Sequence, residues 1–370
     1  MIIEPLYEAT EAIINELLAR WRSTPKRYPF NRPDAIIPQK IIPDWLRENK
    51  QIFANWYVAV CLHMKGRITS LDAFRGHIRV AEKYPEFYIP RIVRWHSDDT
   101  LIKILTECRL TSDHRNVIRD WRMNTMHLDT YYHGNAINLL KGLTSWEEAI
   151  RRIKNKRTKK ERKEAGYAGE GLNGFQEKMV SMLLYFFDWE GWLDPRFPYP
   201  SPSDIQNIRA AIAGGALRII DPDSTRRHDF FTAPWREMVL RYIRERNENP
   251  IDVADVLWLF GNLMCGNSPL TETRIDEGIN GSGLFDEENL PHHLGVEKFL
   301  HPAYRRRLEE TCLVCPFRKF CHLVIPAQPY YKKGIVDLRR RIKMEEHIDI
   351  SQLSEPVYFD KAPNLEFKFS

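Results

Sequence analysis

The sequence predicts an almost wholly α-helical protein. Apolar residues recur at helical spacing in many segments, and runs of alternating β-branched residues are few. With 370 residues, the chain is long enough for two packed domains or one large one. No segment has the length and apolar content of a membrane span, and the first residues lack the basic region of a secretory signal. We therefore expect a cytoplasmic protein that does not enter a membrane.

The predicted helices follow one another along the chain. Residues 101–108 place four apolar side chains on one face, and Ser112-Asp113 then supplies the start signal of the next helix. Residues 147–154 form a further predicted helix. The run 179–187 is apolar on every side, so we expect this helix to be buried. The last predicted helix covers residues 252–265 and ends at a cysteine.

Three regions break the helical pattern. Residues 198–203 alternate proline with other residues and predict a rigid loop. Residues 266–311 read as a long insertion with glycine and asparagine turn signals and a local acidic bias. The tail beyond residue 326 is charged and then alternates near Val357, which predicts either an added strand or disorder.

Positive charge is concentrated in one segment. The net charge is only +5, but residues 151–163 hold nine lysines and arginines against one glutamate. Such a run is usually a solvated helix face. Because it directly precedes a glycine-containing turn, we favour a surface that follows a nucleic-acid backbone and binds it in a salt-dependent way. The residues concerned are Arg151, Arg152, Lys154, Lys156, Arg157, Lys159 and Lys160.

That turn is the second candidate site. Residues 171–178 read Gly-Leu-Asn-Gly-Phe-Gln-Glu-Lys and open the apolar helix. The turn would leave two or three backbone N–H groups at a helix N-terminus, where they attract phosphate. Glycine before a helix is also common in ordinary loops. The residues predicted to contact DNA here are Leu172, Asn173, Gly174, Phe175 and Gln176.

Lys178 is a candidate nucleophile. It begins a helix whose next nine residues carry no charge. Burial there would disfavour the charged ammonium form and make the amine a better nucleophile. The alternatives are a lysine that extends its amine to solvent or one that contacts a phosphate.

Asp204 is a candidate partner for this lysine. Ser203-Asp-Ile-Gln206 reads as a capping box, which places the aspartate in a first helical turn as a carboxylate. A carboxylate held in this way could stabilise positive charge on a sugar ring, or it could simply complement the helix dipole. Asp188 and Asp194 are nearer to Lys178 in sequence and are weaker rivals.

Clustered cysteines predict a metal site. Cys312, Cys315 and Cys321 provide three soft ligands within one loop, and Cys265 is the best candidate for the fourth. Both zinc and iron–sulfur clusters accept four thiolates. In a reducing compartment, six cysteines do not suggest disulfides. The main task of such a site would be to staple the C-terminal loop.

Together these segments resemble the helix-hairpin-helix DNA glycosylase superfamily, which includes endonuclease III and the adenine-mismatch and 8-oxoguanine glycosylases. Residues 172–180 occupy the family's hairpin pattern Leu-Pro-Gly-Val-Gly-x-Lys-Thr-Ala. Residues 203–209 match the spacing of its Val-Asp-x-His-x-x-Arg segment, and Cys312, Cys315 and Cys321 match the last three cysteines of Cys-x6-Cys-x2-Cys-x5-Cys. The likeness covers about residues 50–325.

The sequence departs from the family at several points. Gln176 replaces the second glycine of the hairpin, and Gln206 stands where histidine is frequent. The insertion separates Cys265 from the other cysteines. The interval between Lys178 and Asp204 is longer than usual, which marks this chain as a divergent member.

The resemblance implies two helical domains that flank a DNA-binding cleft. One domain would cover residues 50–195 and contain the helix-hairpin-helix motif. The other would combine residues 1–49 with 196–325, carry the insertion 266–311, and hold an iron–sulfur cluster, most simply 4Fe-4S, or zinc. Residues 326–370 would form a tail.

The resemblance also implies an activity. A monomer would bind double-stranded DNA and flip a damaged or modified base out of the duplex. Our hypothesis for this base is a hypermodified one, such as those of phage DNA. Lys178 would form a Schiff base with the sugar, and Asp204 would stabilise positive charge in the transition state. The alternatives are a monofunctional glycosylase, a DNA-binding protein without catalysis, and a zinc-stapled helical module that binds another partner such as RNA.

Overall fold

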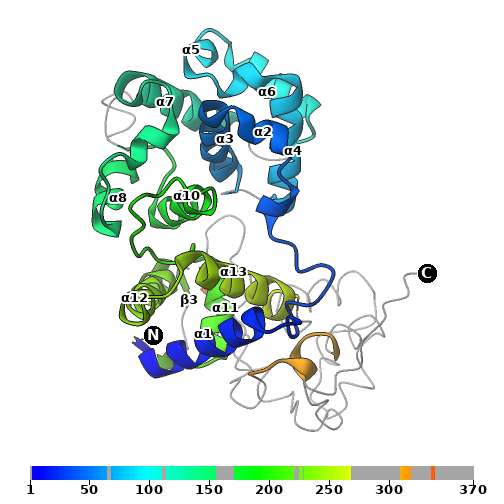
Figure 1. Cartoon of the computed structure of the whole chain (residues 1–370), viewed down its shortest axis with the longest axis vertical. Coiled ribbons are helices and arrows are strands. Elements are labelled where there is room, and N and C mark those ends of the chain that lie inside the picture. Colours follow the sequence, from blue (N-terminus) through cyan, green and yellow to red (C-terminus); the bar gives the residue numbers. More distant parts are fainter. Residues whose placement is uncertain are drawn as a thin grey trace, which may run out of the picture. The chain divides into compact units, whose positions relative to one another are not determined.

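The computed structural model describes residues 2–64, 68–110, 114–155, 171–220, 225–227, 229–267, 309–317 and 335–337. Helices account for most of these residues, which confirms the predicted mostly helical class (Figure 1). Among the described residues, no helix combines the length and the apolar character that crossing a membrane requires.

The chain divides into two compact units. One unit is continuous and covers Ile36–Pro202, and the other combines Met1–Ala35 with Ser203–Ser370. The sequence prediction had placed these divisions near residues 49 and 195. The continuous unit is therefore inserted between two segments that together form the other unit.

The continuous unit is built from helices joined by short turns. Its centre is α3, in which every residue from Phe53 to His63 is buried, and α3 packs against α4 and α10. Helix α10 is buried from Met179 to Asp188, so the prediction that this helix is buried on all sides is confirmed. The elements are η1 (Pro38–Ile41), α2 (Asp44–Glu48), α3 (Lys50–His63), α4 (Ser70–Lys83), η2 (Pro85–Tyr88), α5 (Pro90–Val93), α6 (Asp98–Glu107), α7 (His114–Tyr132), η3 (Ala136–Leu140), α8 (Trp146–Ile153) and α10 (Glu177–Trp189).

Aromatic side chains fill the space between these helices. Tyr57 of α3 stacks on Phe186 of α10 with ring centroids 4.8 Å apart, and Trp56 meets Phe74 of α4 edge to face at 5.2 Å. Such contacts add to the burial of large apolar surfaces. The predicted helix at 101–108 corresponds to α6, and the predicted helix at 147–154 to α8. The expected start at Ser112-Asp113 lies outside the described residues.

A chain of buried polar groups crosses the same core. The hydroxyl of Tyr88 donates to the backbone carbonyl of His77, so it accepts from Nδ1 of that ring at 2.8 Å. Nε2 of His77 therefore accepts from Nδ1 of His63 at 2.7 Å. Burial lowers the pKa of His63 to about 3 and the pKa of His77 well below its usual value. Both rings are consequently neutral at neutral pH.

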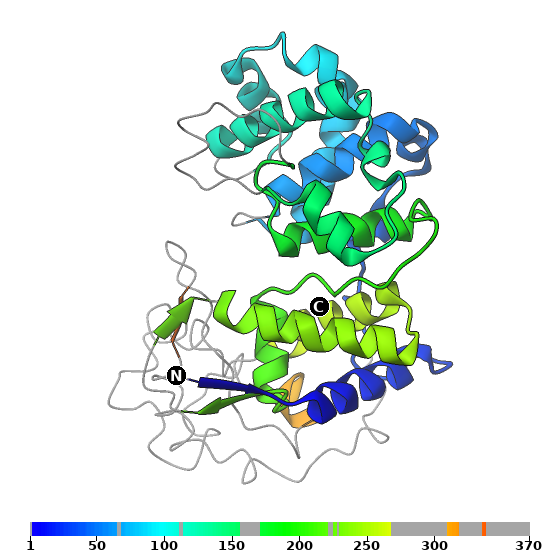
Figure 2. The same cartoon turned by 90° about the vertical axis from the view of Figure 1, so that its left-hand side faces the viewer.

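In its described residues, the discontinuous unit combines helices with two short two-stranded sheets. Strand β1 pairs antiparallel with β2, from Ile2 opposite Ile220 to Pro5 opposite Leu217 (Figure 2). Strand β3 pairs antiparallel with β4, which belongs to the C-terminal tail. The elements are β1 (Ile2–Pro5), α1 (Tyr7–Arg22), α11 (Ile205–Ala213), β2 (Leu217–Ile220), β3 (Thr225–Arg227), α12 (Asp229–Arg246), α13 (Pro250–Phe260), η4 (Gly261–Cys265), η5 (Cys312–Val314) and β4 (Ile335–Asp337).

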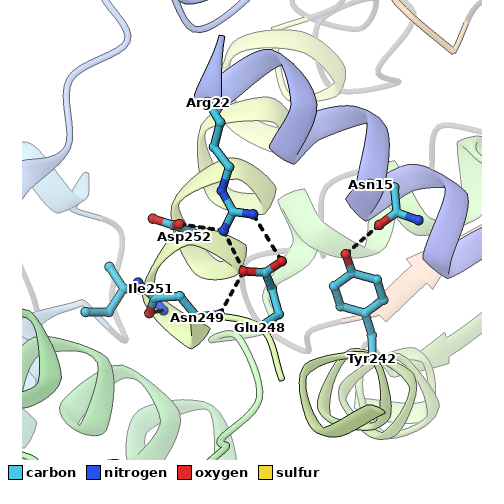
Figure 3. A network of polar contacts seen from close by, with 7 residues as sticks. All are labelled: Asn15, Arg22, Tyr242, Glu248, Asn249, Ile251 and Asp252. Atoms are coloured by element: carbon cyan, nitrogen blue, oxygen red, sulfur yellow. Dashed lines mark hydrogen bonds and ion pairs between the residues drawn. The ribbon is translucent and has the colours of Figure 1, made fainter. Parts of the chain in front are cut away.

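The N-terminal helix is tied to the returning segment by polar contacts (Figure 3). Arg22 at the end of α1 contacts Glu248 and lies 2.7 Å from Oδ2 of Asp252. Tyr242 of α12 donates to the side chain of Asn15 at 2.6 Å. The Arg22 side chain is 46 % exposed, so each of its ion pairs contributes at most about 1 kcal/mol. These contacts mainly fix how α1 lies on α12 and α13.

One predicted helix ends earlier than expected. The α-helix predicted over 252–265 covers Pro250–Phe260, and residues Gly261–Cys265 form a π-helical turn instead. A side chain at Gly261 would place its Cβ only 2.8 Å from the carbonyl oxygen of Gln206, so α11 approaches this turn closely. The apolar spacing continues through the turn, which is why periodicity alone did not reveal the change.

Candidate functional site

The turn before α10 buries its apolar side chains. Leu172 and Phe175 are both fully buried, and the N–H of Phe175 donates to the carbonyl of Leu172 at 3.1 Å. Gly171 and Gly174 have φ values of 74° and 80°, the left-handed region that favours glycine. A ligand at this turn would therefore meet its backbone and the exposed Gln176 rather than its apolar side chains.

The turn is paired with the segment that follows α8. The N–H of Leu172 donates to the carbonyl of Ile153 at 2.9 Å, and the N–H of Asn155 donates to the carbonyl of Phe175 at 2.9 Å. Lys154 and Leu172 form a parallel bridge. The backbones come so close that a Cβ on Gly171 would lie 2.2 Å from the carbonyl oxygen of Lys154.

Three buried asparagines hold this arrangement from inside. Oδ1 of Asn124, on α7, accepts from the N–H of Asn173 at 2.6 Å, and Nδ2 of Asn124 donates to the carbonyl of Asn173 at 3.1 Å. Nδ2 of Asn155 donates to Oδ1 of Asn173 at 2.6 Å. None of the three is more than 6 % exposed. Asn124 and Asn155 were not predicted from the sequence, because one asparagine in a helix or at its end gives no sign of its partner.

The N-terminus of α10 has no side-chain cap. Gln176 is its N-cap residue, and its side chain makes no capping hydrogen bond. Within the described part of the chain, no group accepts a hydrogen bond from the N–H of Gly174 or of Gln176. Together with the partial positive charge of a helix start, these two N–H groups are suited to an anion.

Lys178 lies in the first turn of α10 and is half-buried. Its sequence neighbours Met179 and Val180 are buried. The adjacent Glu177 accepts from Nζ of Lys154 at 2.6 Å. An ion pair between Glu177 and Lys154 thus lies beside the first turn of α10.

Asp204 caps α11, which corrects one detail of the sequence prediction. Its Oδ1 accepts from the N–H groups of Gln206 at 2.9 Å and Asn207 at 3.3 Å, so Asp204 rather than Ser203 is the N-cap. With Asp204 as the N-cap, Gln206 is the second helical residue and does not occupy the third position that a capping box requires. Its Oε1 accepts from Arg209 at 2.9 Å. Lys178 belongs to the continuous unit, and Asp204 belongs to the discontinuous one.

The rival carboxylate Asp188 has a structural task. It is 1 % exposed, lies 2.7 Å from Nε of Arg196 and accepts from the hydroxyl of Tyr199 at 2.9 Å. Burial raises its pKa, while the hydrogen bonds from Tyr199 and Arg196 act in the opposite direction. Asp188 therefore anchors the loop that follows α10.

The predicted basic surface is only partly described. Arg151 is 72 % exposed and lies 3.7 Å from Glu148. Arg152 donates to the carbonyls of Leu139 and Lys141, so it caps the end of η3. Lys156, Arg157, Lys159 and Lys160 lie outside the described residues.

The cysteines lie on two segments of the discontinuous unit. Cys265 is buried at the end of the π-helical turn η4, and Cys312 and Cys315 are half-buried around η5. Phe317, just after this loop, packs against Phe260 of α13 with ring centroids 5.2 Å apart. Within the described ranges, no three metal-ligating side chains are gathered, and Cys321 lies outside them.

The loop that carries Cys312 is held by the N-terminal segment. The hydroxyl of Tyr28 donates to the carbonyl of Glu310, and Nη1 of Arg32 lies 3.4 Å from the same oxygen. Burial raises the pKa of Tyr28 to about 12, so it remains a hydroxyl donor at neutral pH.

Comparison of the chain with protein-family models gives no match, and comparison with curated proteins gives none either.

Proposed function

We propose that this chain is a DNA glycosylase with an associated lyase activity, which removes a damaged or modified base from double-stranded DNA. The observation that carries the proposal is the turn Gly171–Gln176. It feeds the uncapped start of α10, directs two N–H groups to a potential phosphate, and is followed at once by Lys178. The resemblance of this segment to the helix-hairpin-helix pattern supports the same reading.

The proposed chemistry uses two side chains. The base must leave the stack before its glycosidic bond can be reached. The amine of Lys178 attacks C1′ as the bond to the base breaks, and the base departs with the bonding electrons and takes up a proton. The adduct opens to a Schiff base, and loss of a sugar proton expels the 3′ phosphate. Asp204, held by two backbone N–H groups, stabilises positive charge on the sugar.

A metal site is part of the proposal. Cys265, Cys312, Cys315 and Cys321 would hold an iron–sulfur cluster of the 4Fe-4S kind, or zinc. The contact between Phe260 and Phe317 supports this assignment, because it packs the η5 loop against the helix that leads to Cys265. The metal would staple the loop, and no chemical step passes through it. A brown protein with visible absorption would indicate iron and sulfur, whereas zinc would leave it colourless.

The substrate class we favour is a bulky, hypermodified base. The motivation is the long segment between α10 and Asp204, which Asp188 anchors through Arg196 and Tyr199. A segment fixed in this way could shape a larger pocket than a short connection. Release of ordinary oxidised pyrimidines alone would argue against this substrate class.

Borohydride trapping tests the chemistry. The protein is incubated with duplexes that carry an abasic site, an oxidised or alkylated base, or a glycosylated pyrimidine. We expect a covalent adduct that Lys178→Ala abolishes and that Lys83→Ala leaves intact, since Lys83 is an exposed lysine on α4 of the same unit. Base release without an adduct would indicate a monofunctional glycosylase that uses water activated by Asp204. Binding without release would indicate a non-catalytic DNA-binding protein.

A further inference from the structure

The turn that would bind a phosphate contains two flexible residues, Gly171 and Gly174. To bind a phosphate, the N–H groups of Gly174 and Gln176 must nevertheless each be held in a fixed orientation. We propose that Asn124 and Asn155 are positioning residues that fix this direction by holding the turn from its buried side. The inference rests on the proposed function for the identity of the ligand, a DNA phosphate.

The first available N–H is that of Gly174. The carbonyl of Asn173 and the N–H of Gly174 belong to one peptide group, which is planar and, being trans, points them in opposite directions. Nδ2 of Asn124 holds that carbonyl at 3.1 Å. Oδ1 of Asn124 accepts from the N–H of Asn173 at 2.6 Å, so both backbone polar groups of Asn173 are hydrogen-bonded to the same side chain. The N–H of Gly174 must therefore point away from Asn124, which is buried in α7.

The second available N–H is that of Gln176. The carbonyl of Phe175 shares its peptide plane with the N–H of Gln176. The backbone N–H of Asn155 holds this carbonyl at 2.9 Å, so the N–H of Gln176 points away from Asn155. Nδ2 of Asn155 also holds Oδ1 of Asn173 at 2.6 Å, which joins the two peptide planes through one side chain.

The consequence is a preorganised pair of donors. Both N–H groups are fixed by hydrogen bonds on the opposite edge of their own peptide, so neither needs to be ordered when an anion arrives. Preorganisation of this kind strengthens binding by reducing the entropy lost on association. The family hairpin pattern has proline where this chain has Asn173, and a proline cannot donate the N–H that Asn124 accepts.

The test compares two buried asparagines. Asn124→Ala removes both hydrogen bonds to the backbone of Asn173. Asn55→Ala is the matched control, because Asn55 is equally buried and holds the carbonyls of Tyr88 and Gly134 at 2.9 and 2.8 Å in another part of the same unit. Circular dichroism would establish that each variant is folded. DNA affinity is then measured by fluorescence anisotropy with a labelled duplex over a range of salt concentrations.

We expect Asn124→Ala to weaken DNA binding about tenfold, as for the loss of one hydrogen bond to a charged group. The slope of log Kd against log salt concentration should fall by about 0.9, the value for one phosphate contact. Asn55→Ala should leave both quantities unchanged even if it lowers the melting temperature. A role in general stability alone would not change the salt slope.

Other outcomes separate the positioning role of the asparagines from the proposed function. If Asn124→Ala binds DNA with the same affinity and the same salt slope as the wild type, the positioning role is overturned and the proposed function stands. Failure of the wild type itself to bind DNA would overturn the proposed function and the phosphate role together. If Asn124→Ala does not fold, Asn155→Ala replaces it. That variant keeps the backbone bond to Phe175 and loses the one to Asn173, so a smaller change in the same direction is expected, and no change would overturn the inference.

Discussion

Replacement of Gly171 by alanine would test the geometry of the turn most directly. Two effects add at this position. The φ of 74° is unfavourable for any residue with a Cβ, and that Cβ would lie 2.2 Å from the carbonyl oxygen and 2.6 Å from the carbonyl carbon of Lys154. These are backbone atoms, so no side-chain rotation relieves the clash. The turn and the segment after α8 must move apart.

The size of the effect follows from the contacts that this movement breaks. The left-handed conformation costs alanine about 1–2 kcal/mol. Separation would also break the hydrogen bonds from Leu172 to Ile153 and from Asn155 to Phe175, which are each worth about 1 kcal/mol and leave buried groups unpaired. We expect a total loss of about 3–5 kcal/mol in the free energy of unfolding of this unit.

Gly142 provides the matched control. Its φ is 69°, and a Cβ there would meet nothing within 4 Å. Gly142→Ala should therefore cost only the conformational term, about 1–2 kcal/mol. Urea denaturation of wild type and both variants, followed by tryptophan fluorescence, gives the comparison. Equal losses for Gly171→Ala and Gly142→Ala would refute the close approach of the turn to Lys154.

Two further predictions concern buried ionisable groups. The folded pKa of His63 is about 3, below its ordinary 6.5, so the unfolded chain takes up this proton first as the pH falls. The contribution of the neutral His63 ring to the free energy of unfolding is thus complete above pH 6.5. It is lost as the pH falls towards 3, by about 1.4 kcal/mol per pH unit. His63→Phe should make the dependence of the urea midpoint on pH shallower, and an unchanged dependence would contradict this. Arg196→Met should cost about 1–2 kcal/mol at pH 7, because Asp188 loses its partly exposed partner. Without Arg196 the pKa of Asp188 should rise further, so the loss of unfolding free energy should be smaller in acid, where Asp188 is protonated. A loss that does not depend on pH would show that the broken ion pair is not its cause.

The sequence was most informative where one physical requirement dominated. Residues 179–187 are apolar on every side, and only a helix in the core can bury them all, so α10 was predicted correctly. Asp204 was placed correctly at a helix start but one position too far in. Ser203 and Asp204 can both cap a helix, and the extended backbone at Asp204 decides between them. That backbone conformation has no signature in composition or spacing.

Contacts between distant segments could not be predicted from the sequence. Asn124 lies 49 residues before Asn173, and nothing in the local pattern of α7 marks it as the partner of a turn. The π-helical turn Gly261–Cys265 was likewise hidden, because the apolar spacing runs through it. Gln206 comes close to Gly261 in this turn, and this contact between distant segments has no signature in the local sequence. The proposed roles of Lys178 and Asp204 stay predictions, since they depend on DNA.

The insertion of one unit within the other has a consequence for synthesis of the chain. Strand β1 and helix α1 are synthesised before their partners β2, α12 and α13, which follow only after the whole of Ile36–Pro202. At about 5–20 residues per second, this interval lasts roughly 10–30 s. The inserted unit can fold as it appears, whereas the apolar face of α1, with Ile13, Ile14 and Leu17, has nothing of its own unit to cover it. During this interval the nascent chain therefore carries an exposed amphipathic helix, to which we expect a chaperone to bind.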